Sequence, residues 1–353
     1  MTRNDGKAEL VLDDEHEPRR LALYEDGQLV EYFEKNAQAD FYLGAIIAAR
    51  ITRIFASQRR AETKLPNGAL ASFRLGTKPY PKAGDITLLT LTAEPRQHKP
   101  WQAEQGISRA GRLVVLHAGQ TGVRLSHKAK AGKQAVPQEI ATAIMNILPE
   151  GWGAVIKRNV LDNTDYDEAL VSLITEEVKT LLAPLDRVLR GGIVTPSEPQ
   201  YIYHGDDILM AGQLAASMPP QSRIETDPHF WDETSDKLEF ANSSHITLEN
   251  GIVITIEMTQ ALTAIDIDSG TSQLGPKEIA RQSVKPIMRL IRLARLSGIV
   301  VLDMPRLPLA DMEAVLSSMR EEARRDRRAP DILGVSRAGL IEIIIRHHYA
   351  PIR

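Results

Sequence analysis

Short apolar runs separated by turn residues fill the first third of the chain. Residues 19–35 hold two such runs around Asp26-Gly27, a dipeptide that favours a tight hairpin turn. After residue 42 further short runs follow, and they are broken at 66–68 (Pro-Asn-Gly) and at 83–85 (Ala-Gly-Asp). This pattern predicts a hairpin over 19–35 and then a small five-stranded barrel.

Beyond the barrel the pattern alternates between helical and strand-like segments. Apolar positions repeat with helical spacing in 137–148, 165–185, 276–296 and 309–325. Apolar runs predict strands over 111–119, 122–128, 151–160, 251–257, 261–268, 298–304 and 339–345. We assign no regular element to the polar start, residues 1–19, or to 191–235, which is rich in Pro, Gly and Asp.

Two aspartates interrupt the apolar pattern of 261–268. Successive side chains of a strand point to opposite faces, so Asp266 and Asp268 share one face while Ile265 and Ile267 occupy the other. Burying two like charges side by side is costly unless a cation or hydrogen bonds compensate. The pattern therefore indicates a cation near this face.

A third aspartate, Asp303, ends the apolar run 298–304, at the strand end where α/β sheets usually carry their sites. Asp266, Asp268 and Asp303 are thus candidates for one acidic cluster. Magnesium prefers oxygen ligands and keeps water and phosphate oxygens beside one or two carboxylates, which favours a phosphodiesterase. Turn and capping roles are the alternative, since Asp268 precedes Ser269-Gly270 and Asp303 lies close before Pro305.

Composition excludes several classes of function. The 353 residues carry a formal charge of −3, from 43 basic and 46 acidic side chains, so any surface for nucleic acid must be local. The absence of cysteine excludes disulfides, zinc–thiolate sites and cysteine nucleophiles. The polar, acidic start is unlike a secretory signal, and no apolar run reaches membrane-spanning length. We therefore expect a cytoplasmic protein without membrane attachment.

Three segments resemble the ribonuclease E/G family. They are TQALTAIDIDSG (259–270), LSGIVVLDM (296–304) and RRDRRAPDILGVSRAGLIEI (324–343). The barrel segment is similar to the S1 domain of that family, and PEGWGAVIKRNV (149–160) is similar to the start of its 5′-sensor region. The resemblance runs in the expected order from about residue 21 to about residue 346.

The resemblance implies a fold of several subdomains of the α+β and α/β classes. An RNase H-like core is expected in two pieces, 1–36 and 216–272. Between them an S1 barrel of the OB type is expected over 37–105 and a 5′-sensor-like region over 106–215. A DNase I-like α/β subdomain is expected over 273–353.

The resemblance also implies an activity. It predicts a magnesium-dependent endoribonuclease of RNA processing, in which metal-activated water cuts single-stranded RNA to leave 5′-phosphate and 3′-hydroxyl ends. Asp266 and Asp303 match the two metal-holding aspartates of the family, with Mn²⁺ as a substitute for Mg²⁺. Asp268 stands where the family has asparagine, and we include it as a third catalytic and metal-binding candidate. The alternative is a catalytically weak or inactive RNA-binding relative.

Basic residues are candidates for RNA contacts. Arg281, Lys285, Arg289 and Arg292 are spaced three or four residues apart, so they form one stripe if 276–296 is a helix. We expect this stripe and the arginines of 324–328 to contact RNA phosphates, and a solvated helix face is the alternative. The full set of RNA-binding candidates is Lys99, Lys157, Arg158, Arg281, Lys285, Arg289, Arg292, Arg327 and Arg328.

Other positions depart from the family. Lys157-Arg158 replace its Arg-Thr sensor pair, while Lys99 matches a basic position near its RNA path. Its base-stacking aromatics fall on Glu62 and on Ala69 or Leu70, which leaves Phe73 as a candidate replacement. Without cysteine the zinc link between protomers cannot form, so no zinc is expected and the chain is a monomer or a small oligomer.

Overall fold

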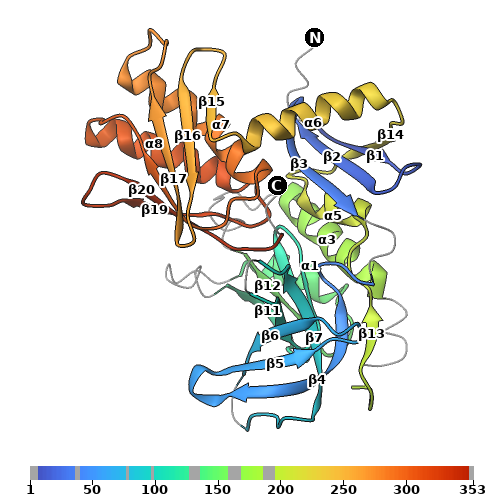
Figure 1. Cartoon of the computed structure of the whole chain (residues 1–353). Helices are drawn as coiled ribbons and strands as arrows, with labels where there is room; N and C mark the ends of the chain where they lie inside the picture. Colours follow the sequence, from blue (N-terminus) through green and yellow to red (C-terminus); the bar gives the residue numbers. More distant parts are fainter. Residues whose placement is uncertain are drawn as a thin grey trace. The chain divides into compact units, whose positions relative to one another are not determined.

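The computed structural model describes residues 7–35, 40–76, 79–96, 99–126, 136–157, 168–185 and 195–349 (Figure 1). The chain divides into two compact units, Met1–Ala37 with Ile208–Arg353, and Gln38–Asp207. We refer to them as unit 1 and unit 2. Both contain sheets and helices, so the protein is a mixed α/β protein with several sheets. None of the described helices combines the length and apolar character that a membrane crossing requires.

Unit 2 begins with a closed five-stranded barrel. Its strands are β4 (Ile46–Phe55), β5 (Arg60–Lys64), β6 (Leu70–Arg74), β7 (Ile86–Ala93) and β8 (Trp101–Gln105). The order β4-β5-β6-β8-β7 closes because β7 also pairs with β4, and β6 and β8 run parallel. This is the connectivity of an S1-like OB barrel, so the predicted five-stranded barrel is confirmed. Strand β13 (Gln200–Tyr203) pairs with β4 from outside the barrel.

The second sheet of unit 2 has the order β11-β12-β10-β9. The strands are β9 (Ser108–Ala110), β10 (Val114–Ala118), β11 (Gly122–Leu125) and β12 (Trp152–Ile156), with helices α1 (Gln138–Met145) and α3 (Glu168–Leu182) and the 3-10 turn η3 (Ala183–Leu185). The carboxylate of Glu177 on α3 accepts hydrogen bonds from the backbone N–H groups of Arg112, Leu113 and Val114. This carboxylate ties α3 to the start of β10.

A four-stranded sheet in unit 1 has the order β14-β1-β2-β3. Its strands are β1 (Ala8–Asp13), β2 (Arg19–Glu25), β3 (Gln28–Lys35) and β14 (Gln221–Ile224), with helices α5 (Ile208–Ala215) and α6 (Pro228–Asn242). The predicted hairpin is confirmed, and Asp26 and Gly27 turn it with φ of 51° and 74°. The expectation of no element over 1–19 is wrong, because β1 pairs with β2 and with the distant β14.

The other sheet of unit 1 has six strands in the order β15-β16-β17-β18-β20-β19. They are β15 (His245–Thr247), β16 (Val253–Met258), β17 (Leu262–Asp268), β18 (Gly298–Asp303), β19 (Asp331–Val335) and β20 (Ile341–Ile345). The helices α7 (Pro276–Leu293) and α8 (Leu309–Ala323) pack their apolar sides against it. The boundary expected at 272/273 falls between β17 and α7, although β17 and β18 are neighbours in this one sheet.

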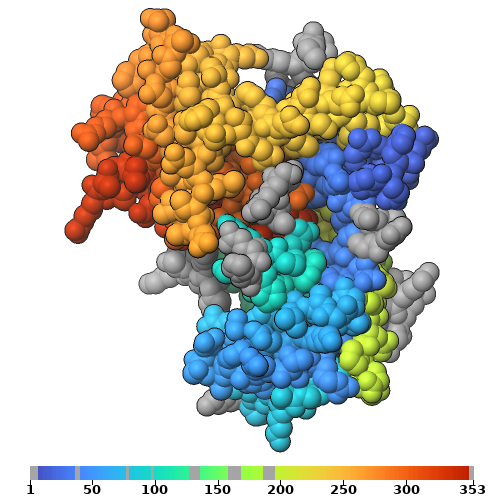
Figure 2. All heavy atoms as spheres, in the orientation of Figure 1, coloured from blue at the N-terminus to red at the C-terminus, as the bar shows by residue number. Residues whose placement is uncertain are grey.

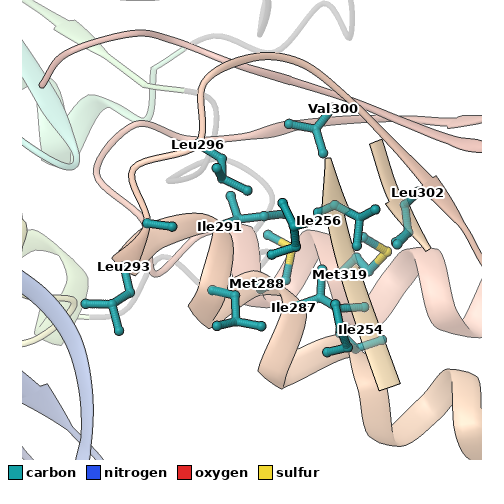
Figure 3. Packing of buried hydrophobic residues seen from close by; sticks show 14 of the residues in the cluster. Ile254, Ile256, Ile287, Met288, Ile291, Leu293, Leu296, Val300, Leu302 and Met319 are labelled. Carbon is teal, nitrogen blue, oxygen red and sulfur yellow. The ribbon is translucent and has the colours of Figure 1, made fainter. Parts of the chain in front are cut away.

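Apolar side chains at every second position of these strands form the core between the sheet and its helices. Ile254 and Ile256 of β16 and Leu302 of β18 are buried against Ile287 and Ile291 of α7 (Figure 3). Each fully buried aliphatic side chain of this kind contributes roughly 1.5–3 kcal/mol. Side chains at the intervening strand positions point to the opposite face, where Asp266, Asp268 and Asp303 are exposed.

Candidate active site

Asp266 and Asp303 lie directly opposite each other on the neighbouring parallel strands β17 and β18. Both carboxylates are exposed, while Ile265 and Leu302, the residues just before them, are buried in the core. Opposed residues on adjacent strands share a face and are about 5 Å apart in the hydrogen-bonding direction. The predicted juxtaposition of these two aspartates near the strand ends is therefore what the register of β17 and β18 produces.

Asp268 lies on the same face, two residues beyond Asp266, but it has a local role. Its Oδ1 accepts a hydrogen bond of 2.7 Å from the backbone N–H of Gly270. Gly270 has φ of +53°, and a Cβ there would lie 2.4 Å from the carbonyl oxygen of Gly251. Asp268 thus stabilises the turn that leaves β17, which is the alternative role considered for it.

The carboxylate oxygens of Asp266 and Asp303 are suitable ligands for a hard divalent cation in an open site. Within the described residues, no group of three or more His, Cys, Asp or Glu side chains has the geometry to hold a metal ion. The expected three-carboxylate cluster is therefore a pair, Asp266 and Asp303, with Asp268 beside it. Two exposed carboxylates are what Mg²⁺ commonly uses when water and substrate oxygens complete its coordination. Thiolate ligands are excluded because the chain has no cysteine.

The basic stripe on α7 does not form one exposed row. Arg281 and Lys285 are exposed, and Arg281 is paired with Glu278 at 2.5 Å. Arg289 is turned toward β3 and donates to the carbonyl oxygen of Leu29 at 3.3 Å. Burial accordingly lowers the pKa of the Arg289 guanidinium below its ordinary value. Only the first half of the stripe is available to a polyanion.

Arg292, the last residue of the stripe, is 5% exposed. It contacts Glu25 at 3.0 Å and Glu31 at 2.6 Å and donates to the carbonyl oxygen of Ala215. Desolvation disfavours its charged form, but the two carboxylates outweigh that cost and raise the pKa of Arg292. The prediction that Arg292 contacts RNA is wrong, because its guanidinium joins α7 to the four-stranded sheet inside unit 1.

Arg327 and Arg328 are also buried, at 7% and 8% exposure. Arg328 forms a forked pair with Asp326 and donates to the carbonyl oxygens of Leu296 and Ile291. Nη1 of Arg327 lies 3.4 Å from the hydroxyl of Tyr349. Arg327 and Arg328 therefore organise the interior of unit 1, and the prediction that these two arginines contact RNA phosphates is wrong.

The candidates in unit 2 have mixed outcomes. Lys99 is exposed on a short bridge with Arg96, and Nζ of Lys157 donates to the carbonyl oxygen of Gly111 at 2.6 Å. Arg158 lies outside the described residues. Phe73 is 2% exposed in the barrel core, so it is not a surface that can stack on a base.

One aromatic residue of the barrel was missed in the sequence. Phe55 is partly exposed, and the guanidinium of Arg60 lies 4.6 Å from the centre of its ring. The signal was present in RIFASQRR (53–60), where an aromatic residue at a strand end is flanked by arginines. Its position differs from Glu62 and Ala69 or Leu70, where the family carries its stacking residues.

Comparison with known proteins supports the resemblance. The sequence profile of the Ribonuclease E/G family matches residues 223–348, the segment that holds β17, β18 and both opposed aspartates. The chain is 34% identical over 118 residues to Ribonuclease E of Escherichia coli (strain K12), which covers 31% of this chain and 11% of that protein. It is 24% identical over 301 residues to Ribonuclease E of Nostoc sp. (strain PCC 7120), covering 72% of this chain and 42% of that protein.

A plant relative shows similarity over a stretch of comparable length. The Ribonuclease E/G-like protein, chloroplastic, of Arabidopsis thaliana is 30% identical over 122 residues, or 31% of this chain and 12% of that protein. The matched regions thus span less than half the length of these relatives. The profile match and the relatives lead to one conclusion: residues 223–348 of this chain, which carry the opposed aspartates, are similar to the ribonuclease E/G family.

Proposed function

We propose that this protein is a metal-dependent endoribonuclease that cuts single-stranded RNA at Asp266 and Asp303. The observation that carries the proposal is the register of β17 and β18, which sets two exposed carboxylates directly opposite each other. A protein that only bound RNA would have little use for paired carboxylates that repel phosphate. The similarity of residues 223–348 to the ribonuclease E/G family and the names of the relatives support the same chemistry.

The two opposed carboxylates would hold Mg²⁺, or Mn²⁺ in its place. When bound, such an ion polarises a phosphodiester and lowers the pKa of a bound water. Asp266 and Asp303 contribute negative charge from two paired strands, so backbone pairing would hold the two carboxylates that bind the cation. Asp268 keeps the turn after β17 in place. We further propose that the products carry 5′-phosphate and 3′-hydroxyl ends. The protein would act in the cytoplasm.

The subdomain assignment is proposed on the same basis. The four-stranded sheet of unit 1 would be the RNase H-like core, and the six-stranded sheet with α7 and α8 would contain the DNase I-like part. The sheet β11-β12-β10-β9 would be the sensor-like region. In this arrangement the barrel and the sensor-like region are inserted between the two chain segments of unit 1.

A catalytically weak RNA-binding relative is the second candidate. The feature that favours it is Asp268, a third carboxylate where the family has an amide, because this position departs from the catalytic residues that the family resemblance implies. Its engagement with Gly270 shows that this carboxylate serves the turn whether or not catalysis occurs.

The test is cleavage of a 5′-labelled, A/U-rich single-stranded RNA in Mg²⁺ by the wild type and by Asp266→Asn and Asp303→Asn. Glu313→Gln is the matched control, since it removes one exposed carboxylate from α8, a helix on the other side of the sheet. We expect both aspartate variants to lose cleavage and the control to retain it. A wild type that binds the RNA but never cuts it in Mg²⁺ or Mn²⁺ would establish the second candidate.

A further inference from the structure

A single row of polar side chains crosses four strands of the six-stranded sheet. His245 on β15 lies directly opposite Thr255 on β16. Thr255 in turn lies opposite Asp266 on β17, which is opposite Asp303 on β18. Residues in register share a face of a sheet. His245 and Thr255 therefore lie on the same face as the two opposed aspartates.

The burial of neighbouring residues agrees with this placement. Ile246, which follows His245, and Ile254, which precedes Thr255, are fully buried in the core that α7 and α8 cover. Side chains alternate along a strand, so His245 and Thr255 point to the other face. His245 is exposed and Thr255 is partly exposed. Much of the segment 245–268, yellow-orange in colour, is visible at the surface in Figure 2.

The imidazole of His245 is held by its neighbour in the row. Its Nδ1 lies 3.1 Å from Oγ1 of Thr255. When the Thr255 hydroxyl donates to Nδ1, a neutral imidazole carries its proton on Nε2, which becomes a donor for a ligand. The hydroxyl of Ser243 fixes the backbone of His245, because it accepts from the N–H at 3.3 Å and donates to the carbonyl oxygen at 2.9 Å.

His245 is the one basic side chain in the strands of this sheet. None of the six strands, all of which the structure describes, contains Lys or Arg. The same strands carry six carboxylates, those of Glu257, Asp266, Asp268, Asp303, Asp331 and Glu342. Side chains that donate hydrogen bonds position a nucleic acid through its phosphates. His245 is therefore the strand residue that is suited to contact an RNA phosphate on this face.

We propose that His245 binds the RNA phosphate next to the one that is cut, and that Thr255 is the positioning residue that orients its imidazole. This inference rests on the proposed function, because the cut phosphate is the one held at Asp266 and Asp303. Neighbouring strands are about 4.8 Å apart, so about 10 Å separates His245 from Asp266. At this separation His245 serves a flanking phosphate and not the one that reacts.

This role predicts a specific kinetic signature. A flanking phosphate does not react, so its contact with His245 has the same strength in the bound substrate and in the transition state. Binding of this uniform kind lowers KM and leaves kcat nearly unchanged. Loss of the contact should therefore raise KM.

The test pairs a protein variant with a modified RNA. After the cut site of a 5′-labelled RNA has been mapped, two further RNAs are made with one methylphosphonate linkage, which has no charge, on either side of the cut. We expect His245→Ala to raise KM for the unmodified RNA roughly five- to tenfold, with little change in kcat. With one of the modified RNAs, wild type and His245→Ala should have the same KM.

Further variants separate the two ring nitrogens. The amide nitrogen of Gln reaches about as far as Nε2, whereas that of Asn reaches only the place of Nδ1, so His245→Gln should restore part of the lost affinity and His245→Asn should not. Thr255→Val removes the hydroxyl and should raise KM, with no further effect when His245→Ala is also present. His229→Ala is the matched control, because His229 is exposed on α6, and it should leave KM unchanged.

A binding measurement makes the test independent of turnover. The anisotropy of fluorescein-labelled RNA is followed in Mg²⁺ with Asp303→Asn as the background, and adding His245→Ala should weaken binding by the same factor as it raises KM. The proposal is overturned if His245→Ala leaves KM and affinity unchanged, or if its effect persists on both modified RNAs. If the wild type binds RNA but never cuts it, the nuclease is contradicted, whereas weaker binding by His245→Ala would still support the phosphate contact.

Discussion

Arg292 on α7 and Glu25 at the end of β2 form a buried ion pair at 3.0 Å, with 5% and 2% of their side chains exposed. The same guanidinium reaches Glu31 on β3. One basic residue thus joins the helix that supports the β17–β18 aspartates to the four-stranded sheet. The pairs compensate charges that would otherwise be buried alone.

Removing Arg292 should therefore destabilise unit 1. We expect Arg292→Met to lower the free energy of unfolding by about 3–5 kcal/mol, because Glu31 remains buried without this cation and Glu25 keeps only the more distant Arg325, at 3.5 Å. Urea unfolding followed by circular dichroism measures the change. Arg281→Met, on the exposed part of the same helix, is the control and should have little effect. Similar unfolding curves for the two variants would contradict the assigned role of Arg292.

Acid should weaken the buried Asp326–Arg328 pair. Burial raises the pKa of Asp326, but the Arg328 guanidinium outweighs it and holds that pKa below its ordinary value. A lowered folded-state pKa stabilises the protein above the unfolded-state value, near 4, and this contribution is lost as pH falls through the folded-state value. We expect the wild type to lose more stability than Asp326→Asn between about pH 5 and 2. Parallel pH profiles of the urea midpoint would contradict this assignment.

The cleavage rate should be far more sensitive to substitution of Asp266 or Asp303 than to substitution of Asp268. We expect Asp303→Asn to reduce the cleavage rate on the order of 10²–10³-fold, with EDTA abolishing wild-type cleavage. Rates are measured with labelled RNA at saturating Mg²⁺. A reduction in rate that excess Mg²⁺ fully reverses would assign Asp303 to metal affinity alone.

Asp268 should tolerate an amide but not a methyl group. In Asp268→Asn the side-chain oxygen can still accept from the N–H of Gly270, so the stability should match the wild type. Asp268→Ala loses this hydrogen bond and should cost about 0.5–1.5 kcal/mol, as measured by urea unfolding. If both variants unfold with the wild-type midpoint, the turn does not depend on this carboxylate.

Two phenylalanines of the barrel should behave differently. Phe73→Ala empties a core position and should cost about 3–5 kcal/mol, which thermal or urea unfolding would show. Phe55→Ala removes a partly exposed ring and should cost far less. A large loss of stability at Phe55 would show that this ring supports the barrel.

Local patterns in the sequence determined much of this protein. The Asp26-Gly27 turn, the barrel strands, the helices α3, α7 and α8 and the strand that carries Asp266 and Asp268 all follow from spacing and turn residues. Alternation also determined that those two aspartates share a face. These features depend on residues close together in the chain, so the sequence alone could predict them.

Tertiary structure decided which residues meet across long separations. Strand β14 was missed because its partner β1 lies far away along the chain, and Arg292 was assigned to the surface because helical spacing does not reveal what packs against a face. The hydrophobic pattern likewise placed Phe73 on a strand, but it did not show that the Phe73 side chain points into the barrel core. Spacing determines which side chains lie together, whereas packing of distant segments determines which of them are buried, paired or left open to a ligand.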